Sequence, residues 1–424
     1  MTIHERREGP AAAPDRVGLF GLLGSGNTGN DVSMESIIAY LRAAHPGAIV
    51  DAMCGGPEAL QARYGIEGVP VLWYQKHERP QPGAWTNFLK ILGKGVDAFR
   101  TAAWVRRHDV VIVPGAGALE ATLPVRPFGF PYSMFLLCAS GRIFGTKVAL
   151  VSVGANQINQ PLTRWFLNGA ARLAYYRSYR DTLSLEAMQR RGIDTTRDCV
   201  YPDLAFAAPG PPLEPGEMHT VGLGIMAYYG GNDDRREAAE IHASYVEKMK
   251  YFSRWLIDSG HNVRLFGGDN KFDDSVAEEI LADLRQYRPG LDSASAKVAS
   301  VSSFGELMQE MSSVRTVVAT RYHNVLCALK LGKPTIALGY SGKFKSLMAN
   351  MGLSDYCQSA KDLDVNRLIE QFQDLERQSL QLRRTMAERN AVVAQLIDEQ
   401  FTKLSALLLP ASTPERQPSR VQEG

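Results

Sequence analysis

The chain has 424 residues, of which 45% are hydrophobic and 22% are charged, proportions that are ordinary for a water-soluble globular protein. Its 47 basic and 45 acidic residues nearly balance, which argues against a general nucleic-acid surface, so no nucleic-acid partner is expected. The length exceeds what a single hydrophobic core usually supports, and two domains are therefore expected.

The cysteines and the apolar segments indicate a compartment. The five cysteines are scattered and show no Cys-x-x-Cys spacing, which favours buried thiols in a reducing cytoplasm over disulfides or zinc. The N-terminus has no apolar segment of signal-peptide length, and no apolar run approaches the roughly 20 residues that cross a bilayer. We expect a cytoplasmic protein without a stable membrane span, with action at the inner face of the membrane left open.

Strand-like and helix-like segments alternate through the first half of the chain, as they do in βα proteins. Short apolar runs predict strands at 17–23, 48–53, 110–113, 147–153, 175–180 and 199–201. Helical spacing covers 33–44 and 88–107. Residues 56–88 are irregular and rich in aromatic side chains, which either stack on sugar rings or pack beneath a long loop.

A proline-rich segment divides the chain. Four prolines fall within residues 209–215 and suit neither a helix nor a central strand, so residues 208–219 are predicted to form a semi-rigid linker. Further strands are predicted at 221–226, 262–266, 316–319 and 334–340, with helices at 236–259 and 324–331. The predicted parts are domains at 16–207 and 220–360, helices at 361–409 that pack back across both domains, and disordered ends at 1–15 and 410–424. The expected fold class is α/β, with two Rossmann-like domains facing a cleft.

An arginine and a histidine follow the buried strand predicted at 316–319. Arg321 and His323 are two residues apart, so on a strand they would project to the same side, next to the N-terminus of a helix that favours anions. Arginine binds anions through two parallel hydrogen bonds, and histidine exchanges protons near neutral pH. Lys343, at the start of the next predicted helix, adds a third cation. We predict a functional anion site here over a structural histidine, and no metal, because no second histidine or carboxylate nearby has ligand spacing.

Other candidates lie at the ends of strands in the first half. Arg180 precedes a predicted helix capped by Asp181 or Thr182, where a guanidinium could bind a carboxylate or phosphate; an ordinary ion pair is the alternative. Asp203 is a weaker candidate for orienting a base or a sugar hydroxyl.

Small-residue loops follow three of the predicted strands. Residues 24–31 fit a Gly-x-Gly-x-x-Gly pattern, with Asp51 roughly 20 residues further on. Asn27 and Asp31 suggest contacts to sugar hydroxyls instead, and a tight turn with an aspartate cap explains the loop equally well. Loops containing Gly117 and Asn156 end later strands. Together the loops indicate a crevice, but they do not identify its contents.

The sequence resembles the polysaccharide pyruvyl transferase family over most of residues 17–355. The similarity is clearest in Arg321-Tyr322-His323-Asn324, Gly332-Lys333-Pro334, Tyr340-Ser341-Gly342-Lys343 and 347–353, and it is fair in Arg180-Asp181 with Ser184 and in Pro202-Asp203-Leu204-Ala205-Phe206. Residues 27–31 carry one asparagine more than the family's Asn-x-Gly-Asp, and Gly115-Ala116-Gly117 departs from a common run of three glycines.

The resemblance implies a transferase, similar to twin Rossmann-like (GT-B) glycosyltransferases, that moves the enolpyruvyl unit of phosphoenolpyruvate onto a sugar of a polysaccharide or glycolipid. The product is a pyruvate ketal, phosphate is released, and no cofactor is needed. The partners implied are phosphoenolpyruvate and a sugar acceptor, free or lipid-linked.

Residue roles follow from the same resemblance. Phosphoenolpyruvate carries a carboxylate and a phosphate, and Arg180, Arg321 and Lys343 can supply the cations that bind them. His323 is the expected general acid, for either the methylene carbon or the leaving phosphate. Asp31 and Asp203 are weak candidates for the base. We expect alanine at Arg321 or His323 to abolish transfer and to leave thermal unfolding nearly unchanged.

Three alternatives stay open. One is a nucleotide-sugar glycosyltransferase of the same architecture, and a second is a non-catalytic polysaccharide-assembly protein with a vestigial anion site. The third is a dinucleotide oxidoreductase, which rests only on the glycine pattern of residues 24–31.

Overall fold

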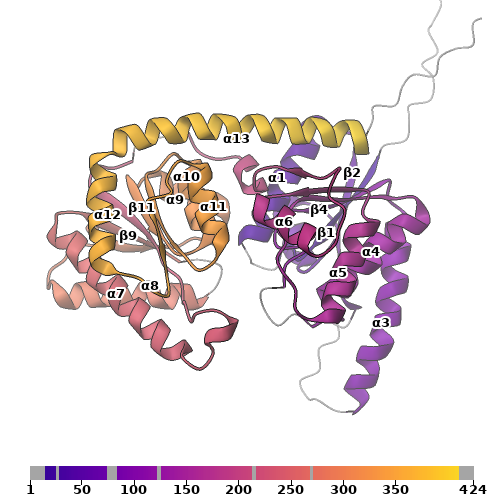
Figure 1. Ribbon diagram of the computed structural model, residues 1–424, viewed down its shortest axis with the longest axis horizontal. Helices are drawn as coiled ribbons and strands as arrows, with labels where there is room; N and C mark the ends of the chain where they lie inside the picture. The colour runs from indigo at the N-terminus through magenta and orange to yellow at the C-terminus, as the bar shows by residue number, and fades with distance from the viewer. Residues whose placement is uncertain are drawn as a thin grey trace, which may run out of the picture.

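The computed structural model describes residues 15–24, 28–73, 84–121, 126–212, 216–267 and 271–409, with backbone alone for 84–91, 232 and 271. Figure 1 shows two α/β domains side by side, with one long helix lying across both. Asn27, residues 74–83 of the aromatic-rich segment and nearly all of the predicted disordered ends lie outside the described residues. The prediction that 56–88 is irregular was wrong for much of the rest, because Pro57–Tyr64 is a helix, Gly68–Pro70 is a strand and another helix begins at Ala84.

The N-terminal domain is built on a parallel sheet of seven described strands in the order β3-β2-β1-β4-β5-β6-β7. Their bounds are β1 Arg16–Gly21, β2 Ile49–Cys54, β3 Gly68–Pro70, β4 Val110–Pro114, β5 Lys147–Val153, β6 Tyr176–Tyr179 and β7 Cys199–Val200. Side chains alternate along β1, so Val17 and Leu19 join one hydrophobic core while Phe20 joins another on the opposite face. Both faces are therefore buried, as is usual in parallel sheets.

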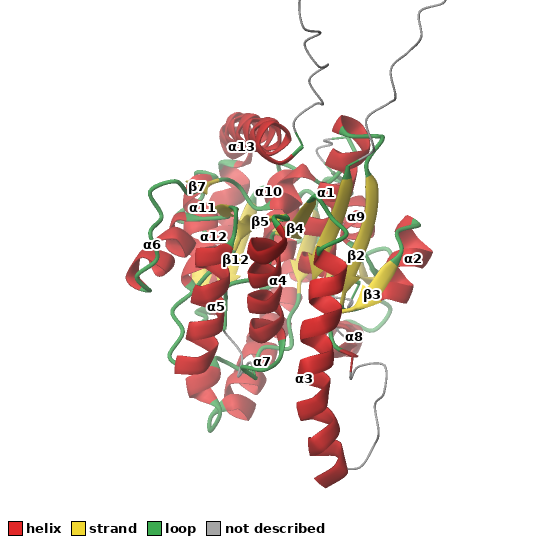
Figure 2. Cartoon of the chain, turned by 90° about the vertical axis from the view of Figure 1, so that its right-hand side faces the viewer, coloured by secondary structure: helices red, strands yellow, loops and turns green. Residues whose placement is uncertain are grey.

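Helices cover both faces of this sheet. The helices are α1 Thr28–Ala44, α2 Pro57–Tyr64, α3 Ala84–Val105, α4 Phe130–Phe144, α5 Pro161–Leu173 and α6 Thr182–Arg190, with a short 3-10 helix η2 at Leu204–Ala207. Figure 2 shows α3, α4 and α5 as one layer in front of the strands, and α4 contacts both of its neighbours. Ile37 of α1 packs in the core on the other face.

The C-terminal domain repeats the plan with a parallel six-stranded sheet in the order β10-β9-β8-β11-β12-β13. Its strands are β8 Thr220–Gly224, β9 Asn262–Phe266, β10 Ala296–Ala299, β11 Thr316–Ala319, β12 Thr335–Gly339 and β13 Cys357–Ser359. Its helices are η3 Asn232–Asp234, α7 Ala238–Asp258, α8 Lys271–Tyr287, α9 Phe304–Ser312, α10 Tyr322–Lys330, α11 Gly342–Asn350 and α12 Val365–Arg377. Both sheets have the strand order of a Rossmann fold, which confirms the predicted fold class.

A final helix, α13 (Ser379–Leu408), spans both domains along one side of the molecule (Figure 1, yellow). Met386 near its start packs in the core of the C-terminal domain, and Leu404 near its end packs in a core of the N-terminal domain. Between them the buried Gln400 amide donates hydrogen bonds to Ser152 and Ser178 at 2.9 and 3.0 Å. The prediction that C-terminal helices pack back across both domains is confirmed.

Candidate active site

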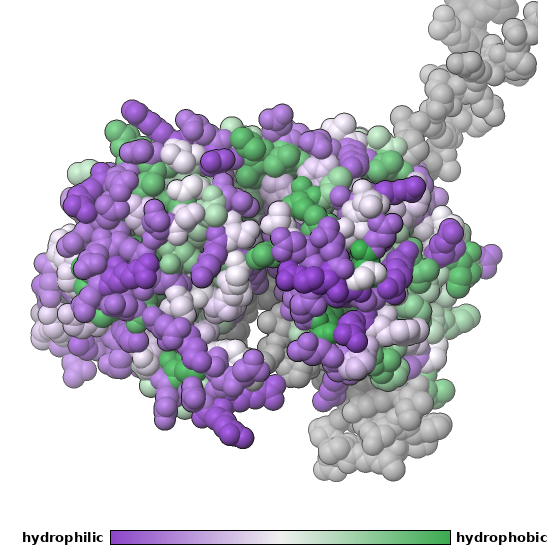
Figure 3. All heavy atoms as spheres, viewed as in Figure 1, coloured by the Kyte–Doolittle hydropathy of each residue, from purple (hydrophilic) through white to green (hydrophobic). Residues whose placement is uncertain are grey.

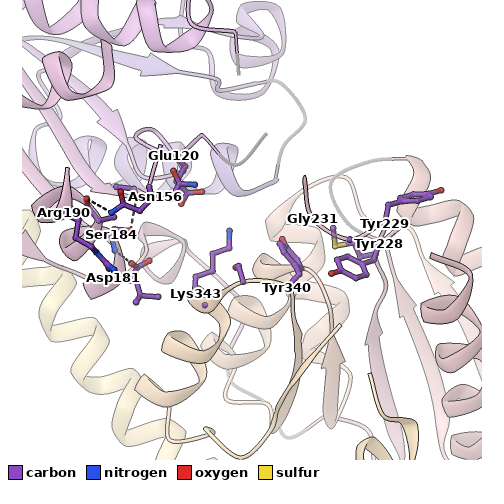
Figure 4. Close-up of a pocket in the computed structure, with 18 of the residues that line it drawn as sticks. Glu120, Asn156, Asp181, Ser184, Arg190, Tyr228, Tyr229, Gly231, Tyr340 and Lys343 are labelled. Carbon is purple, nitrogen blue, oxygen red and sulfur yellow. Dashed lines mark hydrogen bonds between the residues drawn. The ribbon is translucent and has the colours of Figure 1, made fainter. Parts of the chain in front are cut away.

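A cavity of about 610 Å³ lies between the two domains. Its lining residues follow strands of both sheets, and they include Glu120, Asn156 and Asp181 from the N-terminal domain and Tyr228, Tyr340 and Lys343 from the C-terminal domain. In Figure 4 the Lys343 side chain extends from α11 into the space between the domains, towards the loop that carries Glu120. The carboxyl ends of the strands thus meet at the crevice where open α/β sheets bind ligands.

A second cavity of about 360 Å³ shares Asp181 and Lys343 with the first and extends beneath α13. Arg180, Asp203 and Tyr322 also line it. One cluster of charged side chains around Tyr322 therefore borders both cavities.

Arg180 occupies the centre of this cluster. Strand β6 ends at Tyr179, and Asp181 caps α6 by accepting a hydrogen bond from the Ser184 amide at 2.7 Å, which turns Arg180 inward. Its guanidinium lies 2.5 Å from Glu120, 3.4 Å from Asp203 and 3.7 Å from Asp181. Burial acts to lower the pKa of Arg180, but the three carboxylates, Glu120 foremost, raise it overall. Arg180 is therefore a fixed cation that three acidic groups already share.

Lys343 is the second cation of the cluster. Its ammonium lies over the ring of Tyr322 at 5.0 Å and of Tyr340 at 6.0 Å. Within the described part of the chain it forms no hydrogen bond or ion pair. Burial, followed by the charge of Arg180, lowers the pKa of Lys343. An ammonium in this position is available to an anionic ligand.

His323 lies in the first turn of α10, beside the same tyrosine. Its ring meets the Tyr322 ring edge-on at 5.3 Å. It also reaches the N-terminal domain, because a Cβ atom placed on Gly29 of α1 would overlap the His323 imidazole. Glycine at position 29 therefore allows the two domains to approach each other at the histidine. Neither of the two cavities described above has His323 or Arg321 among its described lining residues.

Arg321 is placed differently from the other cations. It is the N-cap of α10, and its Nε and Nη2 atoms bind the two carboxylate oxygens of Asp273 at 2.7 and 2.8 Å. Asp273 is fully buried and also accepts a hydrogen bond from the Ala227 amide. The prediction that Arg321 and His323 project to the same side of a strand was wrong, because β11 ends at Ala319, before both residues. The start of α10 sets the directions of their side chains instead.

The sequence profile of the polysaccharide pyruvyl transferase family matches residues 27–342. The chain belongs to this family. The match contains the arginine–histidine segment, Arg180 and the loops that line the first cavity, so the predicted membership is confirmed and the protein is a transferase that acts on polysaccharide.

Solved structures show the same fold at low identity. UDP-GlcNAc 2-epimerase from Neisseria meningitidis, bound to UDP-GlcNAc, is 10% identical with a TM-score of 0.56, covering 91% of this chain and 100% of that one. Anabaena HepE, in complex with UDP and glucose, is 12% identical with a TM-score of 0.56, covering 92% and 98%. No curated protein matches the chain.

The weaker predicted site residues of this pyruvyl transferase have structural contacts of their own. The Asp31 carboxylate accepts a hydrogen bond from the Gly24 amide at 2.6 Å, and Asp203 caps η2 by accepting one from the Ala205 amide at 3.1 Å. Asn156 accepts a hydrogen bond from the Ala121 amide at 2.9 Å and also lines the first cavity. The Asn156 and Asp203 contacts hold loops that line the two cavities, whereas Asp31 and Gly24 are not among the described lining residues of either.

Glu120 is a site residue that the sequence analysis missed. A Cβ atom on Gly117 or Gly154 would collide with its carboxylate, so both glycines leave space for the Glu120–Arg180 pair. This contact explains the small residue that the sequence singled out at position 117. Glu120 could have been predicted as a site residue from its position, three residues after the small-residue loop that follows a buried strand.

Two further properties concern metals and membranes. Over the described ranges, no three histidine, cysteine, aspartate or glutamate side chains gather as a metal ion requires. No helix among the residues that the structure covers is long and apolar enough to cross a bilayer.

Proposed function

We propose that this pyruvyl transferase takes phosphoenolpyruvate as its donor and forms a pyruvate ketal on two hydroxyls of a sugar, releasing phosphate. Membership of the family supports pyruvyl transfer. The observation that carries the choice of donor is Lys343, whose ammonium faces the interdomain cavity without a hydrogen bond or ion pair in the described chain, next to Arg180.

The charges around Tyr322 favour a place for the donor. Arg180 is already shared by three carboxylates, which repel an anion. Lys343 and His323 both lie against the Tyr322 ring, and Lys343 forms no ion pair with these carboxylates in the described chain. We therefore assign the phosphate and carboxylate of phosphoenolpyruvate to the side of the cluster held by Lys343 and His323. Each charge-assisted hydrogen bond contributes about 1.5–3 kcal/mol.

The reaction needs three proton transfers, namely loss of a proton by each of the two hydroxyls and gain of one by the methylene carbon. One sugar hydroxyl adds to C2 of phosphoenolpyruvate while the methylene carbon gains a proton and becomes a methyl group. The C2–O bond to phosphate then breaks, and the second hydroxyl closes the ketal as its proton passes to the departing phosphate. His323 is assigned the role of general acid, at carbon or at phosphate. Lys343 stabilises the charge on the leaving group.

Glu120 is the best candidate for receiving the proton of the attacking hydroxyl, because its carboxylate lines the larger cavity while Asp203 caps a helix. Glu120→Gln retains an oxygen for Arg180 and removes the proton acceptor. We expect this variant to bind phosphoenolpyruvate normally and to lose about 100- to 10,000-fold in kcat. The control is Glu186→Gln, which alters an exposed carboxylate on α6. A Glu120→Gln enzyme with normal kcat would contradict the assignment.

Lys343 predicts a pH dependence of donor binding. Only the charged ammonium attracts the donor, so binding is complete below the pKa of Lys343 and is lost as the pH rises through it. That pKa lies below the ordinary value of 10.5, because burial and Arg180 lower it. Lys343→Arg should keep a low KM for phosphoenolpyruvate to higher pH, and Lys343→Gln should raise the KM roughly 10- to 100-fold at neutral pH. An unchanged KM in the glutamine variant would count against the proposal.

One assay tests the function directly. Phosphate release from phosphoenolpyruvate is measured with galactosides, mannosaminides and glucosides as acceptors, and mass spectrometry identifies a pyruvate adduct. Thermal stabilisation by phosphoenolpyruvate should accompany turnover. Stabilisation by uridine or guanosine diphosphate, without any by phosphoenolpyruvate, would favour a nucleotide-sugar glycosyltransferase instead.

A further inference from the structure

The outer surface of the layer formed by α3, α4 and α5 exposes an unusual number of large apolar side chains. Phe99 on α3 is 76% exposed, Ile143 on α4 is 75% exposed, and Trp165 on α5 is 58% exposed. Phe128, in the loop before α4, is 51% exposed. On the face shown in Figure 3, hydrophobic side chains gather towards the outer edge of the N-terminal domain, whereas the C-terminal domain is mostly hydrophilic. We call the surface that carries Phe99, Phe128, Ile143 and Trp165 the α3–α5 face.

An aromatic cluster anchors the α3–α5 face. The Phe128 ring meets Phe166 at 5.6 Å between centroids, Phe166 meets Trp165 at 5.1 Å, and Trp165 meets Phe135 at 5.0 Å. Phe166 is buried, so it fixes its neighbours, while Phe128 and Trp165 present more than half of their surfaces to solvent. The exposed rings are therefore held rigidly, and they need not lose much conformational freedom on binding a partner.

The same region is strongly basic. The sequence from Ala121 to Leu173, which includes α4 and α5, contains no aspartate or glutamate and five basic residues, namely Arg126, Arg142, Lys147, Arg164 and Arg172. This is a local asymmetry, because the whole chain carries a net charge of only +2.

The acidic residues just before this segment do not neutralise the α3–α5 face. Asp97 of α3 is buried and accepts a hydrogen bond from the Trp73 amide. Asp109 accepts one from the Arg16 amide, and Glu120 lies in the cleft. Arg126 and Arg164 are exposed, and among the described residues their side chains make no ion pair or hydrogen bond.

We propose that the α3–α5 face docks on a lipid bilayer that contains anionic lipids. Tryptophan and phenylalanine enter the interfacial region of a bilayer, and arginines beside them attract anionic headgroups. A second copy of the chain fits less well, because a two-fold interface would bring this basic surface against itself. The charge and the rigid aromatic rings together favour a membrane surface.

Docking in this way has a consequence for the cleft. Helix α5 begins at Pro161, four residues after Gln157, which lines the larger cavity. The aromatic cluster is thus joined directly to a wall of the cleft, and a sugar carried on a lipid would meet the cavity from the membrane side. This last step rests on the proposed function, whereas the docking itself does not.

Vesicle flotation of the full-length protein tests the docking. The probes are vesicles of phosphatidylcholine alone and of phosphatidylcholine mixed with phosphatidylglycerol, at low and at high salt. We expect binding only to the mixed vesicles, with loss at high salt because the Debye length falls from about 8 Å to about 3 Å at 1 M. Arg126→Glu with Arg164→Glu should weaken binding by more than about tenfold, since each basic residue near such a surface contributes about fivefold.

Matched variants separate the surface from general effects. Trp165→Ala should weaken binding several-fold, while Tyr251→Ala, on α7 with a similarly exposed ring, should leave it unchanged. Arg285→Glu on α8 is the control for charge. Equal binding by the control and test variants, or no binding of the unaltered protein to anionic vesicles, would overturn the proposal. So would a dimer in solution that Trp165→Ala dissociates, because the face would then join two copies.

Discussion

Replacing His323 by glutamine is expected to lower kcat for phosphate release from phosphoenolpyruvate by about 100- to 10,000-fold, the usual contribution of a general acid. The thermal midpoint should change little, because glutamine retains polarity and much of the volume of a side chain that is only partly buried. The measurement is steady-state phosphate release with an acceptor sugar, together with a thermal melt. A variant whose thermal midpoint falls while its rate of phosphate release is unchanged would show that His323 has a structural role.

Gly29→Ala provides a second test of the same histidine without removing any polar group. The added methyl group would occupy the space of the imidazole, so His323 or the two domains must shift. A misplacement of about 1 Å can cost about 100-fold in rate, so the single variant should lose activity. Adding Gly29→Ala to His323→Gln should cause little further loss. Full activity of Gly29→Ala would contradict the arrangement in which the two domains meet at His323.

Arg321→Ala is expected to destabilise the protein, in contrast to the expectation drawn from the sequence. Removing the guanidinium takes the Arg321 cation away from the fully buried Asp273 carboxylate, at a cost of about 3–5 kcal/mol. The matched control is Arg254→Ala, because Arg254 binds Asp283 through the same two nitrogens at a more exposed position. That change should cost about 1 kcal/mol or less. Thermal melts of the two variants measure the difference, and equal shifts would refute the argument from burial.

A double variant then separates support from donor binding. Asp273→Asn removes the buried charge and keeps an acceptor for the Ala227 amide, so Arg321→Ala with Asp273→Asn should regain part of the lost stability. If the double variant also regains transfer, Arg321 acts by positioning its surroundings. A stable but inactive double variant would indicate that Arg321 binds the donor itself.

The central strands could be predicted from the sequence to within a residue or two. An uninterrupted apolar run such as Thr316–Ala319 suits a strand buried on both faces. The short strands β3, β10 and β13 at or near the sheet edges were missed, since three or four residues, with Gly68 and Pro70 among them, give no apolar alternation. Helix α4 was missed for the opposite reason, because its residues are apolar around most of the circumference and show little helical period.

The candidate site was predictable only where it depends on position along a strand. Arg180 and Lys343 follow strand ends, so the parallel sheets carry them to the cleft. The pairing of Arg321 with Asp273, 48 residues away, and the contact of His323 with Gly29 depend on packing between distant segments. No local pattern specifies such contacts.

The long helix α13 restricts how the two domains can move. Its 30 residues form a rod of about 45 Å that is fixed in the cores of both halves. If the two domains hinge beside this helix, the cleft widens on the side away from α13, and both ends of the helix stay packed in the two cores. Twisting one half against the other would instead pull the Gln400 amide from Ser152 and Ser178, leaving polar groups unpaired inside the protein. The helix therefore guides the enzyme towards clam-like opening.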